Sequence, residues 1–245
     1  MRSAALPFLM ALLAMSLTAH RASAETLSAS VMEIPPWGYT DRNTGHAAGL
    51  YSDILERLIR TAGYEPVLAI RPYIRVSKDM ASGASRVTLM SDNHRIRAAA
   101  IAIATLRPLD IVVIGSGGAA LTDPAQLQGK RIATLSGVEH HLLLKDIPGI
   151  AFEFSPSTEG QFKMLAAGRV DYVLGVREAL AYGLRTSPFA GREHVADGLL
   201  IGHWTARLWQ TRTGYDAKLS ARLTAALKAM QDSGAIEAAF RMYAD

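Results

Sequence analysis

The chain has 245 residues, with 26 lysines and arginines, 22 aspartates and glutamates, and no cysteine. The absence of cysteine excludes disulfides, thiolate metal sites and a catalytic thiol. The basic residues are scattered along the chain rather than clustered, which argues against a nucleic-acid partner.

Residues 1–24 have the pattern of a signal peptide. Arg2 gives a positive start, residues 6–17 are apolar, and residues 22–24 read Ala-Ser-Ala, a small-residue cleavage site. The apolar run is shorter than the roughly 20 residues that span a bilayer. We therefore expect a protein that is exported to the periplasm and cleaved after Ala24, with no lipid-modified cysteine to anchor it.

In the first half of the mature chain, apolar strands alternate with amphipathic helices. Residues 26–34 read as a strand that stops at Pro35 and Pro36. The segments that follow are expected to be a loop at 41–49, a helix at 50–63, a strand at 64–72, a helix at 73–83 and a strand at 86–90. This alternation at short spacing predicts a parallel α/β sheet.

The same alternation restarts downstream. In the helix expected at 158–168, Phe162, Leu165 and Ala166 are expected to face the core. The other expected elements are a turn, a short helix and a strand within 123–137, a helix at 138–147, strands at 151–154 and 169–176, and two helices within 216–243 that separate at Ser233 and Gly234.

Two β-branched runs, at residues 106–118 and 195–211, connect the two halves of the chain. Two separate connections predict that the second lobe is inserted into the first. We therefore expect an α/β protein of two lobes joined by two hinge strands. Lobe 1 is expected to comprise residues 25–109 and 201–245, and lobe 2 residues 110–200. Such a geometry can close around a ligand.

Four segments follow one another in a recognisable order: IPPWGYTD, RPYIRVSKDMASG, LQGKRIATLSG and MLAAGRVDYVLG. Together with the export signal and the two lobes, this order resembles family 3 of the periplasmic solute-binding proteins, the substrate-binding proteins of amino-acid ABC importers. The resemblance covers nearly the whole mature chain. It implies the two-lobed type II periplasmic-binding-protein fold, a small-molecule ligand in the cleft between the lobes, an inner-membrane ABC permease as partner, and a monomer.

The resemblance places Trp37 and Tyr39 on the wall of this cleft, because ligands of open α/β sheets bind at the carboxyl ends of the strands. Aromatic faces bury a large area and attract cationic groups. The alternative is that Trp37 packs beneath the helix that begins near Leu50. Tyr73 and Arg75 are expected to reach the cleft from the first lobe, with a surface position as the alternative for Arg75.

Arg95 follows the strand at 86–90, where the family has an arginine that pairs with a ligand carboxylate through two charge-assisted hydrogen bonds. Arg97 is the alternative anchor, and an exposed basic loop is the other alternative. Ser91 and Asp92 occupy the positions from which the family offers backbone and hydroxyl groups to the same carboxylate.

Ser136, Gly137 and Val138 lie at a strand-to-helix turn in the second lobe. Free amides at a helix N-terminus suit an anion, so we expect these residues to contribute to the ligand site. The family usually has a small hydroxyl residue near Val138. Glu139 and His140 add a carboxylate and an imidazole, but adjacent helical residues point about 100° apart, and we expect no metal there.

The family carries an aspartate just after the strand at 169–176, where it pairs with the ammonium group of an amino acid. In this chain that position falls at Gly175 or Val176, and Arg177 follows. An uncharged residue beside an arginine cannot neutralise an ammonium, and a buried unpaired charge is costly. We therefore expect Val176 and Arg177 to line a site for an anionic solute, or one without a free α-amino group, rather than for an ordinary amino acid.

Periplasmic solute binding for an ABC importer is the leading functional hypothesis. The alternative is a periplasmic sensory or accessory binding module that is not coupled to transport. We expect no enzyme and no cofactor, because the sequence has no G-x-S-x-G, H-E-x-x-H or P-loop motif.

Overall fold

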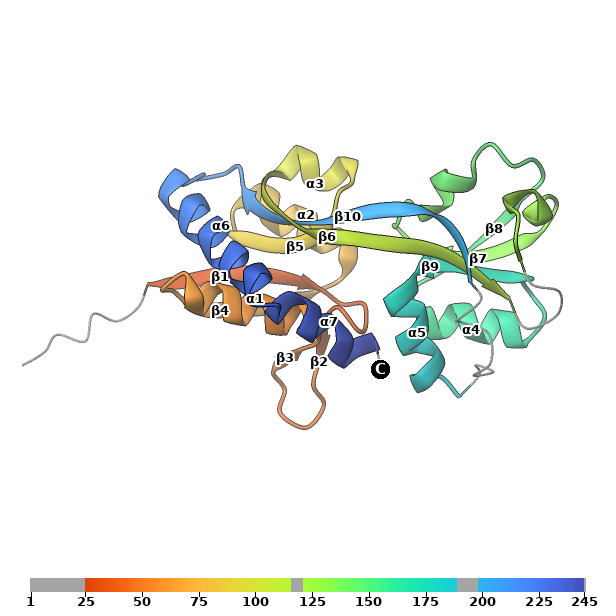
Figure 1. Ribbon diagram of the computed structural model, residues 1–245, viewed down its shortest axis with the longest axis horizontal. Helices are drawn as coiled ribbons and strands as arrows, with labels where there is room; N and C mark the ends of the chain where they lie inside the picture. Colours follow the sequence, from red (N-terminus) through yellow and green to blue (C-terminus); the bar gives the residue numbers. More distant parts are fainter. Residues whose placement is uncertain (1–24, 116–120, 189–197, 245) are drawn as a thin grey trace, which may run out of the picture.

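The computed structural model describes residues 25–115, 121–188 and 198–244, so the expected signal peptide lies outside the described residues. Figure 1 shows two lobes joined by two long strands that run from one lobe into the other. These strands, β6 (Ala100–Gly115) and β10 (Leu199–Thr211), pair with each other in antiparallel register. The expected fold class, an α/β protein whose second lobe is inserted between two hinge strands, is confirmed. The exact lobe boundaries stay a prediction.

One sheet runs through both lobes in the order β4-β1-β5-β10-β6-β9-β7-β8. Within each lobe the other strands pair in parallel, as expected, whereas the hinge strands are antiparallel to their neighbours β5 and β9. The parallel strands are β1 (Thr26–Met32), β4 (Glu65–Arg71) and β5 (Val87–Ser91) in the first lobe, and β7 (Arg131–Leu135), β8 (Ala151–Ser155) and β9 (Tyr172–Val176) in the second.

Helices pack around this sheet in both lobes (Figure 1). The first lobe carries α1 (Leu50–Thr61), α2 (Tyr73–Ser82), α3 (His94–Ala99), α6 (Ala217–Asp232) and α7 (Ala235–Ala244). The second lobe carries α4 (Thr158–Ala166), α5 (Arg177–Thr186) and the short 3₁₀ helices η1 (Pro124–Leu127) and η2 (His140–Leu144). Within the described residues, none of the helices combines the length and the apolar character needed to cross a membrane.

Helix α1 follows the apolar stripe that the sequence predicts. Ile54, Leu55, Leu58 and Ile59 are fully buried, and burial of each such side chain contributes about 1.5–3 kcal/mol. Gly49 precedes the helix with a φ of 108°, and a Cβ there would lie 2.7 Å from a backbone oxygen. Only glycine fits this tight entry into α1, which brings the helix against the Pro-Pro-Trp turn.

The polar segment after β5 contains the short helix α3, which the sequence pattern does not predict. Asn93 caps it, since its Oδ1 accepts hydrogen bonds at 3.0 Å from the amides of Arg95 and Ile96. The loop expected at 41–49 contains the turn and the second strand of a small hairpin, which β2 (Tyr39–Thr40) forms with β3 (Ala47–Ala48).

Two helices of the second lobe differ from expectation. The helix expected at 138–147 is reduced to η2. In α4, Phe162 is buried as expected, but Ala166 is exposed and Gln161 is fully buried. The inward face of α4 therefore includes a polar residue. Helix α5, which follows β9, was not expected at all.

Candidate functional site

The carboxyl ends of parallel strands from both lobes meet at the interface between the lobes. Met32 ends β1 and Ser91 ends β5 in the first lobe, while Leu135 ends β7 and Val176 ends β9 in the second. All of them line one cavity of about 30 Å³. The lobes are therefore closed on each other at the edge where open α/β sheets bind ligands.

Trp37 both packs in the core and lines this cavity. Its side chain is 4% exposed, and its ring centroid lies 4.8 Å from that of Tyr51 on α1 and 6.2 Å from that of Phe240 on α7. The amides of Leu50 and Tyr51 donate to the carbonyls of Pro36 and Trp37, both at 2.8 Å. Trp37 therefore packs against α1, as one alternative expects, and also lines the cavity.

The second lobe contributes buried polar side chains to the cavity. His140, Thr158 and Gln161 all line it and are 4%, 8% and 0% exposed. Each carries a buried polar atom without a hydrogen-bond partner, namely Nδ1, Oγ1 and Oε1. The Nε2 of Gln161 is bonded instead, and donates to the carbonyls of Ala133 at 3.2 Å and Leu174 at 3.0 Å.

His140 is neutral in this site. Burial, with a smaller effect from the adjacent His141, lowers the pKa of His140 to about 3. Its ring packs edge-on against Trp204 of β10, with the centroids 4.5 Å apart. The imidazole therefore adds hydrogen-bonding capacity to the cavity without adding charge.

The rest of the wall is uncharged as well. Among the described residues that line the cavity, none is Asp, Glu, Lys or Arg. Val176, near the position of the aspartate that the resemblance implies, is 6% exposed. Burial raises the pKa of Tyr73 to about 12, and its hydroxyl accepts a hydrogen bond from Nδ2 of Asn93 at 3.1 Å. The cavity is thus mainly apolar, with a few neutral polar groups.

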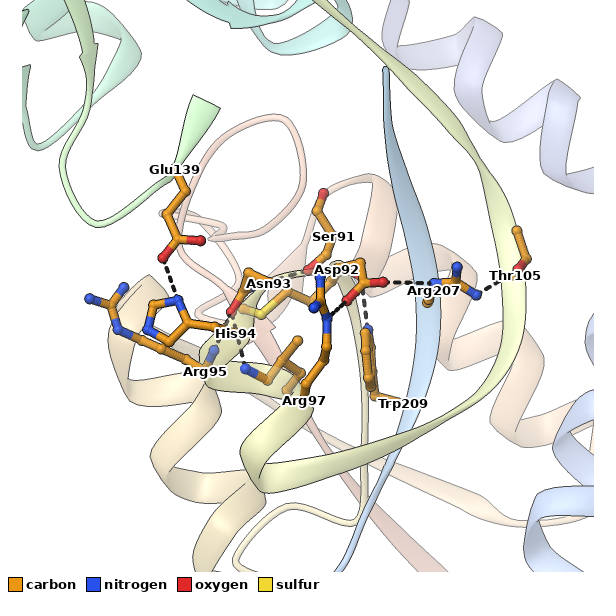
Figure 2. Close-up of polar contacts among 12 residues, drawn as sticks. Ser91, Asp92, Asn93, His94, Arg95, Arg97, Thr105, Glu139, Arg207 and Trp209 are labelled. Atoms are coloured by element: carbon orange, nitrogen blue, oxygen red, sulfur yellow. Dashed lines mark hydrogen bonds and ion pairs between the residues drawn. The ribbon is translucent and has the colours of Figure 1, made fainter. Parts of the chain in front are cut away.

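Arg95 and Arg97 lie outside the cavity. Arg95 donates from Nη1 to the carbonyl oxygen of Gly137 at 3.2 Å. Figure 2 shows Asp92 between two guanidinium groups, those of Arg97 at 2.5 Å and Arg207 at 3.4 Å. In this conformation neither predicted anchor lies among the residues that line the cavity at the strand ends.

Polar contacts outside the cavity bridge the two lobes. Nδ1 of His94 lies 2.5 Å from a carboxylate oxygen of Glu139, as Figure 2 shows. Arg185 on α5 donates to the carbonyl oxygen of Tyr243 on α7 at 2.6 Å. With the bond from Arg95, these contacts hold the lobes closed without using the residues of the cavity.

Arg177 lies at the hinge rather than in the cavity. Its Nε donates to Asp110 on β6 at 3.2 Å, and Nδ1 of His203 on β10 lies 2.9 Å from the other oxygen of Asp110. Asp110 and His203 face each other in the register of the hinge strands. Nearby, Arg107 approaches Glu178 at 3.9 Å, and burial raises the pKa of Glu178.

A wider groove of about 700 Å³ lies beside the cavity. The β2–β3 segment, including Tyr39 and Asp41, forms one side, and α4 and α5, including Glu159 and Tyr182, form the other. Thr158 lines both the groove and the cavity. Open space between the lobes therefore reaches the cavity wall at Thr158.

The structure brings together only part of the set of residues predicted from the sequence. Those that line the cavity are Trp37, Tyr73, Ser91, Val138 and Val176, and Tyr39 lines the groove. Those that line neither are Arg75, Asp92, Arg95, Ser136, Gly137 and Arg177. The ligand-binding roles of all these residues stay predictions.

Sequence analysis did not identify Thr158, Gln161 or Trp204 as site residues, and it named His140 only while weighing a metal. The available signal was Gln161, a polar residue beside Phe162 on the apolar side of a helix. In the part of the chain that the structure describes, no group of three His, Cys, Asp or Glu residues could hold a metal ion.

No protein-family model matches the sequence, and no curated protein matches it. Solved structures match its fold. The VFT2 domain of BvgS from Bordetella pertussis, solved as a double mutant, gives a TM-score of 0.75 at 15% identity, over 89% of this chain and 93% of that chain. The substrate binding protein of an amino acid ABC transporter gives 0.70 at 13% identity, over 89% and 98%.

A histidine kinase sensor domain with similarity to periplasmic binding proteins gives a TM-score of 0.72 at 17% identity, over 91% of this chain and 97% of that chain. The chain therefore has the two-lobed fold of periplasmic binding proteins. The resemblance drawn from its motifs is confirmed at the level of the fold.

Proposed function

We propose that the protein is a periplasmic binding protein that captures a small organic solute between its lobes and delivers it to an inner-membrane ABC permease. The observation that carries the proposal is the cavity at which the strand ends of both lobes converge. A solute held there contacts both lobes, so its binding favours the closed arrangement over an open one.

The lining of the cavity supports a solute other than an ordinary amino acid. Among the described lining residues there is no carboxylate, and Val176 lies near the position where the resemblance implies one. A buried ammonium group without a partner is costly. The proposal therefore excludes solutes with a free α-amino group.

An anionic solute is the form of this proposal that the resemblance implies. It requires Arg95 to exchange the carbonyl oxygen of Gly137 for a ligand carboxylate when the lobes part. A guanidinium suits this role, because its donors match the geometry of a carboxylate. The Arg95 variant described below tests it.

A sensory or accessory binding module is the second candidate function. The likeness to a histidine kinase sensor domain supports it, as the likeness to the substrate binding protein of an ABC transporter supports transport. Both functions use the same cleft, so the membrane partner decides between them. Photo-crosslinking in intact cells identifies that partner: a permease subunit supports transport, and a receptor kinase supports sensing.

Native mass spectrometry of the protein purified from the periplasm tests solute capture. We expect a monomer that carries a small co-purified molecule, which is lost after unfolding and refolding. Small-angle scattering of the stripped protein then tests hinge closure, since the radius of gyration should fall when the solute is restored. A tightly bound solute that leaves the radius unchanged contradicts a cleft that closes on its ligand.

A further inference from the structure

Three residues that line the cavity carry unpartnered polar atoms, which indicate a ligand. His140 Nδ1, Thr158 Oγ1 and Gln161 Oε1 belong to side chains that are each more than nine-tenths buried and that line the same cavity. Buried polar atoms in native proteins are nearly always hydrogen-bonded, because their desolvation is otherwise uncompensated. Three such atoms around one cavity point to a bound group that supplies the missing partners.

Gln161 fixes the direction of one of these hydrogen bonds. Its Nε2 donates to two backbone carbonyls, those of Ala133 and Leu174, so the orientation of its amide is determined and Oε1 is the free end. A carbonyl oxygen can only accept, and its partner must therefore be a donor, such as a hydroxyl or an amide N–H. A threonine hydroxyl and a neutral imidazole can each donate or accept a hydrogen bond, so they can bond to a group that both donates and accepts.

The other residues of the cavity wall indicate the polarity and charge of the rest of the ligand. Trp37, Val138, Val176 and Trp204 present apolar surface, and the described lining residues carry no ionised side chain. A charged group enclosed here would have no counter-ion, whichever its sign. The cavity wall therefore suits a ligand whose remaining part is apolar.

We infer that the cavity selects an uncharged solute with a compact apolar body and one polar end that donates a hydrogen bond, such as an alcohol, a phenol or a primary amide. His140, Thr158 and Gln161 bind that end. The inference rests on the proposed function, whose cleft it uses, and replaces the anionic form with a neutral one. A cavity of about 30 Å³ is too small for such a solute, so the inference requires the lobes to stand further apart in the complex than they do here.

The test uses a matched series of small aromatic probes on the full mature chain, stripped of co-purified molecules. Benzyl alcohol and benzamide are neutral and donate a hydrogen bond, whereas benzyl methyl ether is neutral and cannot. Benzoate and benzylammonium carry a charge of either sign. We expect the two neutral donors to bind at least about tenfold more tightly than the ether and than both ions, as measured by calorimetry or ligand-detected NMR.

Two threonine variants separate ligand binding from a structural role. Thr158→Val removes the unpartnered hydroxyl from the cavity and keeps the shape of the side chain. Thr134→Val makes the same change at a hydroxyl that is also buried and unpartnered, but outside the cavity lining. We expect Thr158→Val to reduce the preference for benzyl alcohol over its ether to less than about threefold, and Thr134→Val to leave it unchanged.

The inference is overturned if either ion binds more tightly than benzyl alcohol, if neither neutral donor binds at millimolar concentration, or if Thr158→Val keeps the full preference. If a co-purified solute still changes the radius of gyration, these outcomes overturn the inference but not the proposed function. A protein that carries no solute and never changes its radius contradicts the proposed function itself.

Discussion

The guanidinium of Arg95 donates a hydrogen bond to the carbonyl oxygen of Gly137 at 3.2 Å, so a side chain of the first lobe is bonded to the backbone of the second. Beside it, His94 and Glu139 form a second bridge between the lobes. Both contacts lie outside the cavity. These contacts stabilise the closed arrangement without a solute. A solute therefore binds only when the contacts break and the lobes separate.

Arg95→Ala distinguishes a closing contact from a ligand anchor. Loss of one interlobe hydrogen bond should weaken solute binding by no more than about tenfold. Removal of a bidentate partner from a bound carboxylate would weaken it by roughly thirtyfold to several thousandfold. Calorimetry with the co-purified solute measures the difference. Arg97→Ala is the comparison variant, because the side chain of Arg97 pairs with Asp92 in its own lobe and Arg97 is the alternative anchor. A loss of about thirtyfold or more in either variant identifies that arginine as the anion anchor.

Val176→Asp should create affinity for amino acids. The new carboxylate would face the cavity and could neutralise an α-ammonium group, so amino acids should bind more tightly than the matched acids without the amine. Arg177 is already paired with Asp110 and leaves the new carboxylate free. Val176→Asn is the control for size and polarity. Strong binding of ordinary amino acids by the unmutated protein would show that the ligand class is misassigned.

His140 should make stability depend on pH. Its pKa falls from 6.5 in the unfolded chain to about 3 in the folded protein. Between these values the unfolded state binds the proton and the folded state does not, so the free energy of unfolding decreases as the pH drops below about 6.5. The contribution approaches about 1.4 kcal/mol per pH unit. Urea unfolding of His140→Phe from pH 7 to 4 should show a shallower decrease. Identical slopes would mean that His140 is accessible to solvent.

Gly183→Ala should displace Thr158, a residue of the cavity wall, and destabilise the packing of α5 on α4. A Cβ at Gly183 would lie 2.6 Å from Cγ2 of Thr158 and 2.7 Å from Cε2 of Phe162, so α4 and α5 must separate. Such overpacking costs about 1–3 kcal/mol. Thermal unfolding measures the cost. Adding Thr158→Ser, which removes the nearer methyl group and keeps the hydroxyl, should restore part of the stability. No restoration would place the clash at Phe162 alone.

Export should remove residues 1–24. N-terminal sequencing of the periplasmic protein is expected to begin at Glu25, because Ala22 and Ala24 supply the small residues that signal peptidase requires. An Ala24→Leu variant should be processed more slowly or at another bond. Exported material that begins with Met1 would contradict the assignment.

The sequence predicts the elements well where the signal is local. The stripe in α1, the break at Ser233 and Gly234, and the strand end at Val176 all follow from periodicity and turn residues. Helix α3 was missed because it is short and has only Ile96 and Ala99 buried. Its capping residue, Asn93, was the usable signal.

The site was harder to predict because it depends on packing between lobes. Gln161 lies on α4 and Trp204 on β10, far apart in sequence, and no local rule brings them to one cavity. Charge alone does not identify the site residues either. Arg95 and Arg177 are predicted ligand groups, and in this structure their side chains bond to Gly137 and Asp110.

The hinge strands pair with each other, and Val113 faces Leu199 in their register. The chain thus enters and leaves the second lobe at one place. Segments whose ends adjoin can be moved between hosts without stretching the chain. Recombination at this pair would exchange the second lobe as a cassette. His140, Thr158 and Gln161 would travel together, so a single genetic event could replace the polar half of the cavity while the aromatic half at Trp37 stays in place.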